Sequence, residues 1–154
     1  MNSIKSQDGM IEILARCGYR CDLCPGYHRN IRTKEDCEHT SAGWLKYVGE
    51  HVPPDVVPCP GCLAVEPFID DEGNPLRSTD PNCSVKPCVI ERGLENCSCC
   101  PEFSCEKLEF YMNFMEKKHG DFSKITQEDF ENFIRPYLSK ERLLVIRKKR
   151  GIVT

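Results

Sequence analysis

Six cysteines lie within the 23 residues from Cys83 to Cys105, and this density limits the possible fold more than any other feature. Within the stretch, Cys97 and Cys100 form a C-x2-C pair, with Cys88 upstream. Two thiolates three residues apart can bind one ion from a tight turn, and two more from flanking segments complete a tetrahedron. A site with four thiolate ligands has no open coordination position for a substrate, which is typical of a structural site. We therefore expect a fold built around metal rather than buried or paired cysteines without one.

Two further motifs supply thiols in the first half of the chain. The stretch CGYRCDLC holds Cys17, Cys21 and Cys24. The stretch CPGC, from Cys59 to Cys62, is a compact pair whose glycine can take a positive φ. Because no βαβ pattern surrounds it, CPGC indicates a zinc knuckle rather than a thioredoxin-type redox pair. The C-x3-C-x2-C spacing of the first motif is similar to the cluster loop of radical S-adenosylmethionine enzymes, so a Cys-ligated [4Fe–4S] cluster stays open as the alternative.

Counting these thiols predicts two zinc ions. Short loops cost less entropy to close than long ones, which favours ligands that are near one another in the chain. The predicted ligands are Cys88, Cys97, Cys100 and Cys105 for one ion and Cys21, Cys24, Cys59 and Cys62 for the other. In an interleaved arrangement, which stays open, Cys17 or Cys83 replaces one of these ligands.

Four other residues of metal-binding type are predicted not to be ligands. Cys99 is excluded because adjacent side chains rarely face one ion, and Cys100 has the better spacing to Cys97. Cys37 lies among charged residues and is predicted to be a free surface thiol. We interpret His28 and His39 as exposed or capping residues, since there are already enough thiolates.

Composition supports a metal-built core. Of the 154 residues, 40% are hydrophobic, but this count includes 12 cysteines, and without them the fraction is about 32%, below that of an average domain. A net charge of −3 does not indicate a nucleic-acid partner. We find no secretory signal and no apolar run long enough for a membrane span. Many thiols without export indicate a reducing cytosol, so we expect a cytoplasmic protein.

The pattern predicts a small, metal-stabilised α+β or irregular fold in a single domain, 1–154. A cysteine-rich half, 10–105, packs on a helical half, 104–150. In the cysteine-rich half, the predicted elements are a strand or helical turn at 10–16, a helix at 41–51 with Ser41 as N-cap, a turn at 72–75 and a helix at 87–92 with Cys88 at its start. In the helical half, we predict a helix at 105–119 capped by Ser104 and a helix from Thr126 that ends or kinks near Pro136. A cationic segment follows at 139–150.

Taken together, CGYRCDLCP, CPGC, C-x4-C and ERGLENC-x2-CPEFSCEKL resemble the cysteine-rich prokaryotic domain of unknown function numbered thirty-seven ninety-five in the usual series. The resemblance runs from about Cys17 to Leu108, and proteins of this family are suspected of binding zinc. It implies ten ligand candidates, which are Cys17, Cys21, Cys24, Cys59, Cys62, Cys83, Cys88, Cys97, Cys100 and Cys105. Cys37 and Cys99 lie outside the family pattern. The family supplies no established activity.

These observations lead to two functional hypotheses. The first is a non-catalytic, zinc-binding cytoplasmic protein whose sites are mainly structural and which acts as an interaction module for a protein partner not identified by the sequence. The sequence has no H-E-x-x-H, no G-x-S-x-G and no phosphate-binding glycine loop, so we expect no catalytic role. The second hypothesis is an iron–sulfur redox or electron-transfer protein.

Overall fold

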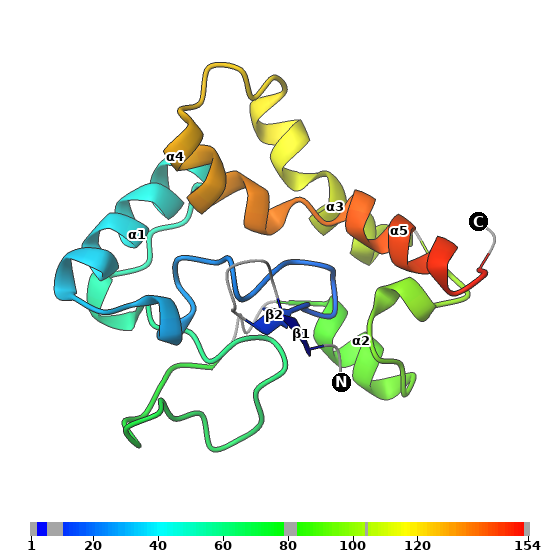
Figure 1. Cartoon of the computed structure of the whole chain (residues 1–154), viewed down its shortest axis with the longest axis horizontal. Coiled ribbons are helices and arrows are strands. Elements are labelled where there is room, and N and C mark those ends of the chain that lie inside the picture. The colour runs from blue at the N-terminus through cyan, green and yellow to red at the C-terminus, as the bar shows by residue number, and fades with distance from the viewer. Residues whose placement is uncertain (1–2, 6–10, 79–82, 104, 153–154) are drawn as a thin grey trace.

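The computed structural model describes residues 3–5, 11–78, 83–103 and 105–152 (Figure 1). In this part of the chain, five α-helices and one short antiparallel sheet are joined by long irregular segments. Strand β1 (Ser3–Lys5) pairs with β2 (Ile11–Ile13), with Ser3 opposite Ile13. The apolar run at 10–16 therefore contains a strand. The fold has less strand than the predicted α+β class implies, because many backbone hydrogen bonds of the cysteine loops are made within turns.

Helix α1 (Lys34–Tyr47) begins well before the predicted start at Ser41. Thr33 is its N-cap, and its side chain accepts a hydrogen bond from the Asp36 backbone N–H while the Asp36 carboxylate accepts from Thr33 N–H, which completes a capping box. The prediction overlooked this box because charged residues follow it. Ser41 instead lies inside the helix. Gly49, at φ 87°, follows the C-cap, near the predicted end.

Two predicted elements between the cysteine motifs are present. Asp70 accepts hydrogen bonds from the backbone N–H groups of Glu72 and Asn74, at 2.9 and 2.8 Å, which forms the turn predicted at 72–75. Helix α2 (Val85–Glu91) ends before Gly93, which has a φ of 66°. Cys88 lies in the middle of α2 and not at its start, because the helix begins before Pro87.

The C-terminal part is helical. Helix α3 (Glu106–His119) has Cys105 at the N-cap position and ends at Gly120, and the predicted cap Ser104 lies outside the described residues. Thr126 caps α4 (Gln127–Asp129), as predicted, by accepting from the Asp129 N–H at 3.2 Å. The chain continues through a π-helical turn (Phe130–Ile134) and a 3-10 helix (Arg135–Tyr137), and then forms α5 (Lys140–Lys149). The helical segment thus changes at Pro136, as predicted.

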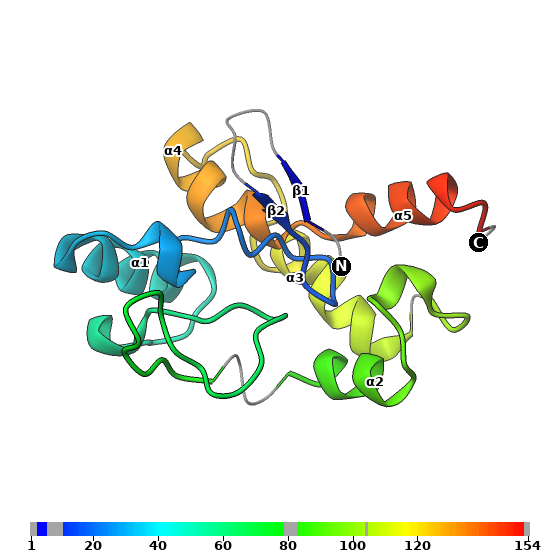
Figure 2. The same cartoon turned by 60° about the horizontal axis from the view of Figure 1, so that its bottom comes forward.

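Buried side chains form two cores. The first core joins the cysteine loops to α2, α3 and α5 and consists of Ala15, Cys17, Cys62, Val85, Val89, Cys97, Leu108, Met112 and Leu143. The second core joins α1 to the segment after α4 and consists of Trp44, Tyr47, Val57, Met115, Phe133 and Ile134. Helix α3 contributes to both cores. Figures 1 and 2 accordingly place α2 and α5 at one end of the molecule and α1 at the opposite end.

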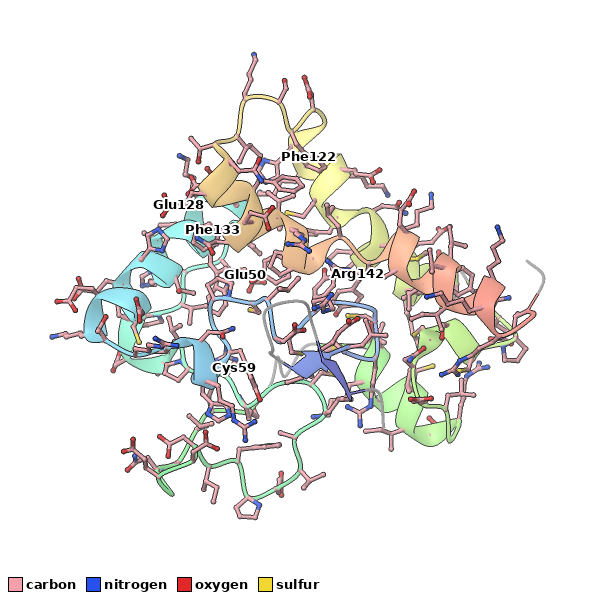
Figure 3. The ribbon with its side chains drawn as sticks, viewed as in Figure 1. Glu50, Cys59, Phe122, Glu128, Phe133 and Arg142 are labelled. Atoms are coloured by element: carbon pink, nitrogen blue, oxygen red, sulfur yellow. The ribbon has the colours of Figure 1, made fainter. Side chains whose placement is uncertain are left out.

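The absence of a side chain at Gly43 decides how α1 packs. A Cβ atom at this position would lie 1.9 Å from the Phe133 ring, so only glycine allows the ring to rest on the helix backbone. Phe133 belongs to the π-helical turn after α4, and its ring packs on α1 (Figure 3). Within the described residues, no helix is both long enough and apolar enough to cross a membrane.

Candidate metal centre

The first cysteine loop, 17–24, is a series of tight turns. Gly18, at φ 93°, follows Cys17, and its N–H donates to the Ala15 carbonyl at 2.9 Å. A side chain at Gly18 would lie 2.8 Å from Leu143 and Ser139, so the loop lies directly against the start of α5. Arg142 donates to the Gly18 carbonyl at 3.1 Å from the same region (Figure 3). The last helix therefore holds this loop in place.

The CPGC motif lies alongside the first loop. Cys59 N–H donates to the Gly26 carbonyl at 2.8 Å, and His28 N–H donates to the Cys59 carbonyl at 2.9 Å. Cys59 is labelled in Figure 3. Burial, together with the neighbouring Cys62, Cys24 and Cys59 sulfurs, raises the pKa of Cys21 far above its ordinary value. The structure thus brings together the two C-x2-C pairs that the sequence assigns to one ion.

The two additional candidates, Cys17 and Cys83, lie near the same group. Burial raises the pKa of Cys17 well above its ordinary value, and the nearby sulfurs of Cys62, Cys83 and Cys21 raise it further. Cys83 also contributes to the raised pKa of Cys97. Cys83 therefore lies between the two predicted sites, and the interleaved arrangement stays open.

The second predicted set lines a single small cavity. Its volume is about 20 Å³, close to the room that one water molecule needs. The cavity is lined by the four thiols of the set, which are Cys88, Cys97, Cys100 and Cys105. Eight other residues complete the lining: Val85, Val89, Arg92, Leu94, Glu102, Phe103, Lys107 and Leu108. Burial, followed by the other three sulfurs of the set and Cys83, raises the pKa of Cys97 to about 12. Cys99 is not among the lining residues.

Backbone N–H groups lie near the sulfurs of the first group. The Gly61 N–H donates to the Cys59 sulfur at 3.4 Å, and the backbone N–H groups of Tyr19 and Cys62 lower the pKa of Cys17 and Cys21 respectively. Hydrogen bonds to a charged acceptor favour its charged form. These N–H groups therefore favour the thiolate, which is the form that binds metal, although burial raises the pKa of Cys17 and Cys21 by more.

Arginines that the sequence analysis did not single out also donate to sulfur. Arg16 donates to the Cys62 sulfur at 3.4 Å, Arg92 to the Cys100 sulfur at 3.8 Å, and Arg150 to the Cys99 sulfur at 2.6 Å. Four thiolates around a divalent cation would leave a net negative charge, which the guanidinium groups of Arg16 and Arg92 would offset, whereas Cys99 is not a predicted ligand. No sequence pattern marks these arginines, because each contact depends on how distant segments pack.

The rings of the two candidate histidines pack against aromatic side chains. The ring of His28 packs edge-on against Tyr27, at 4.9 Å between centroids, and burial lowers its pKa. His39, on α1, packs against Phe133 at 5.4 Å. Cys37, predicted to be a surface thiol, is half-buried on α1 against the second core. Cys37 packs against this core because α1 begins at Lys34, before the predicted start at Ser41, and so includes Cys37 in its first turns.

The donor set fits a thiophilic metal in chemistry and in cavity size. In the described ranges, however, no three His, Cys, Asp or Glu side chains stand in a geometry that could hold a metal ion.

Comparison with known proteins gives one match. A family model described as protein of unknown function (DUF3795) matches residues 13–110. No curated protein and no solved structure matches the chain. All twelve cysteines lie within the matched residues.

Proposed function

Since the chain belongs to the DUF3795 family, whose description assigns no activity, we propose from the site itself that it is a metal-binding protein that holds zinc through cysteine thiolates. The observation that carries this proposal is the small cavity lined by Cys88, Cys97, Cys100 and Cys105. Four thiols, apolar side chains and the charged side chains of Arg92, Glu102 and Lys107 surround a space of the size of one ion. Bound zinc would cross-link α2, the Cys97–Cys100 knuckle and the start of α3.

The proposal assigns a second ion to Cys21, Cys24, Cys59 and Cys62, with Cys17 and Cys83 as possible substitutes. Two features support it, which are the hydrogen bonds that join Cys59 to Gly26 and His28, just after the first loop, and the Gly61 N–H that donates to the Cys59 sulfur. The chain's own residues would position the sulfurs, exclude water and offset their charge. Because all predicted ligands are thiolates, we assign these sites a structural rather than a catalytic role.

A cytoplasmic location and a role as a protein-interaction module complete the proposal. All twelve cysteines lie in the described part of the chain, and each is a free thiol there. Free thiols in this number are typical of a reducing compartment. Val65 and Ile69, with 79% and 49% of their surface exposed, provide apolar contact area for a protein partner.

An iron–sulfur protein is the second candidate. It is favoured by the burial of Cys17 and by the backbone N–H groups near the sulfurs of Cys17 and Cys21, since hydrogen bonds and burial set the potential of such clusters. The C-x3-C-x2-C spacing supports it as well.

Elemental analysis of protein purified anaerobically, without added metal, tests both candidates. We expect two zinc ions per chain and no visible colour. Brown protein that contains iron and acid-labile sulfide would instead establish the iron–sulfur candidate. Protein that contains neither metal, and that takes up none from a stoichiometric addition of Zn²⁺, would show that the proposal is wrong.

A further inference from the structure

One of the predicted ligands is hydrogen-bonded to the helical part of the chain. The Tyr137 hydroxyl lies 3.1 Å from the Cys24 sulfur, and the indole N–H of Trp44 donates to the same hydroxyl at 2.7 Å. Tyr137 belongs to the 3-10 helix after α4, and Trp44 belongs to α1. Three segments that are distant in sequence therefore meet in one hydrogen-bonded chain.

The direction of these bonds follows from the chemistry of the groups. An indole N–H can only donate, so the Tyr137 oxygen accepts from Trp44. Of the Trp44 indole and the Cys24 sulfur, which the described residues place within hydrogen-bond distance of this hydroxyl, only the sulfur can accept its proton. Burial and the adjacent Cys24 raise the pKa of Tyr137 well above its ordinary value, which is consistent with a phenol that keeps its proton. Tyr137 thus donates to Cys24.

Backbone N–H groups also lie near the Cys24 sulfur. Those of Gly26 and Tyr27 lower the pKa of Cys24 against the larger effect of burial, and the Tyr27 N–H donates to the Cys24 carbonyl at 3.1 Å. A neutral thiol is a weak acceptor, whereas an anionic or metal-bound sulfur is a strong one. The Tyr137 hydroxyl and the nearby N–H groups therefore suit a sulfur that carries negative charge, as a metal ligand does.

Trp44 is held against the turn that follows Cys24. A Cβ atom at Gly26 would lie 2.2 Å from the indole ring, so the ring rests directly on the backbone there. The Tyr137 ring packs edge-on against Tyr19, at 5.3 Å between centroids. Packing therefore fixes both aromatic rings of the hydrogen-bonded chain.

We propose that Tyr137 is a positioning residue of the metal site that contains Cys24, and that its hydroxyl couples the occupancy of this site to the environment of Trp44. This inference rests on the proposed function and specifies it further. Tyr137 lies beyond residues 13–110, which match the family, so the coupling comes from the C-terminal part of this chain. A metal-bound Cys24 sulfur would accept the Tyr137 proton more strongly than a neutral thiol does. Because hydrogen bonds in a chain polarise one another, the phenol oxygen would then also accept more strongly from the Trp44 indole N–H.

The chain contains one tryptophan, so tryptophan fluorescence, excited selectively over the five tyrosines, reports on Trp44 alone. We expect the emission of the metal-free protein to shift when Zn²⁺ is added, and to saturate as the site fills. Tyr137→Phe removes a single oxygen atom and keeps the ring against Tyr19. In this variant we expect the same number of bound ions, a loss of most of the fluorescence shift, and zinc affinity lower by about tenfold, as is typical when a partner of a metal ligand is removed.

Tyr47→Phe is the matched control. Tyr47 also belongs to the second core, but its hydroxyl donates to Asp129 at 2.5 Å and not to a sulfur. We expect this variant to keep both the wild-type fluorescence shift and the wild-type affinity. Circular dichroism of the three metal-loaded proteins checks that they are folded alike.

Each other outcome overturns the inference. Zinc uptake by the wild type without a fluorescence shift would do so, as would Tyr137→Phe with either a retained shift or an unchanged affinity. Elemental counts separate these results from failure of the proposed function. A wild-type chain that binds no metal refutes the metal site and the coupling together, whereas a loaded site with no response at Trp44 refutes the coupling alone.

Discussion

The guanidinium of Arg147, on α5, donates a hydrogen bond to the backbone carbonyl of Cys100 at 3.2 Å. The same nitrogen donates to the Ser98 carbonyl at 3.0 Å, and the guanidinium lies over the Phe103 ring, 4.4 Å from its centroid. Only 5% of the Arg147 surface is exposed. The last helix therefore holds the Cys97–Cys100 knuckle through a buried cation, although no cysteine lies on that helix.

Arg147→Met should destabilise the protein, because it leaves two carbonyl groups without their charged donor. We expect a loss of about 3 kcal/mol in the free energy of unfolding, measured by urea denaturation. Lys148→Met is the control, since Lys148 is exposed on the same helix, and it should change stability by less than about 0.5 kcal/mol. Equal effects of the two variants would contradict the role assigned to Arg147.

Gly43→Ala should destabilise the protein, although alanine favours helices more than glycine does. The added Cβ would overlap the Phe133 ring, so we expect a loss of about 2 kcal/mol or more in the free energy of unfolding. Ala42→Gly, at the exposed neighbouring position, should cost only about 1 kcal/mol from helix propensity. A stabilising Gly43→Ala variant would show that the ring does not rest on α1.

Metal-free and metal-loaded protein should respond to pH in opposite directions. Without metal, burial raises the pKa of Cys24 to about 11 and that of Cys97 to about 12, above the ordinary value of 9.0. A raised thiol pKa means that the folded state holds protons more tightly, so its stability is present below about pH 9 and falls as the pH rises toward 12. With metal bound, protons compete for the thiolates, so acid should release metal and structure together.

Urea unfolding at a series of pH values, with and without a chelator, measures both slopes. Metal-loaded protein whose stability is constant down to pH 4 would contradict ligation by thiolates.

Removal of metal should unfold the cysteine loops before the helices of the second core. Thiolate ligation contributes about 10 kcal/mol or more per zinc ion, and the first core has cysteines among its buried residues. The second core relies on Trp44, Phe133 and Ile134 instead. Hydrogen exchange after chelation should accelerate first at 17–24 and 97–100, and later in α1. Simultaneous exchange of all these segments would show that the two cores unfold as one.

Single Cys→Ser variants test how the ligands are divided. We expect Cys62→Ser and Cys100→Ser each to lose one of two ions, because each removes a ligand from a different predicted set. Cys37→Ser and Cys99→Ser should keep both ions. Cys99 is the sharper control, since it neighbours Cys100 but does not line the small cavity. A Cys100→Ser variant with full metal content would refute the proposed division.

Local features of the fold were predictable from the sequence because they depend on residues a few positions apart. Gly120 ends α3, Thr126 caps α4, and Pro136 changes the course of the helical segment after it. The start of α1 was predicted wrongly, although the Thr33 to Asp36 capping box is also local. In that segment, few apolar residues mark the first turns of the helix.

The sequence by itself determined which thiols can act as ligands and how closely they are spaced, since C-x2-C geometry is a property of a single turn. Only the tertiary structure decided which side chains surround them. Cys24 and Tyr137 are 113 positions apart, and Arg147 and Cys100 are 47 apart. No local pattern encodes such contacts, because they form only when the helices pack and bring hydrogen-bond donors to sulfur and to the knuckle backbone.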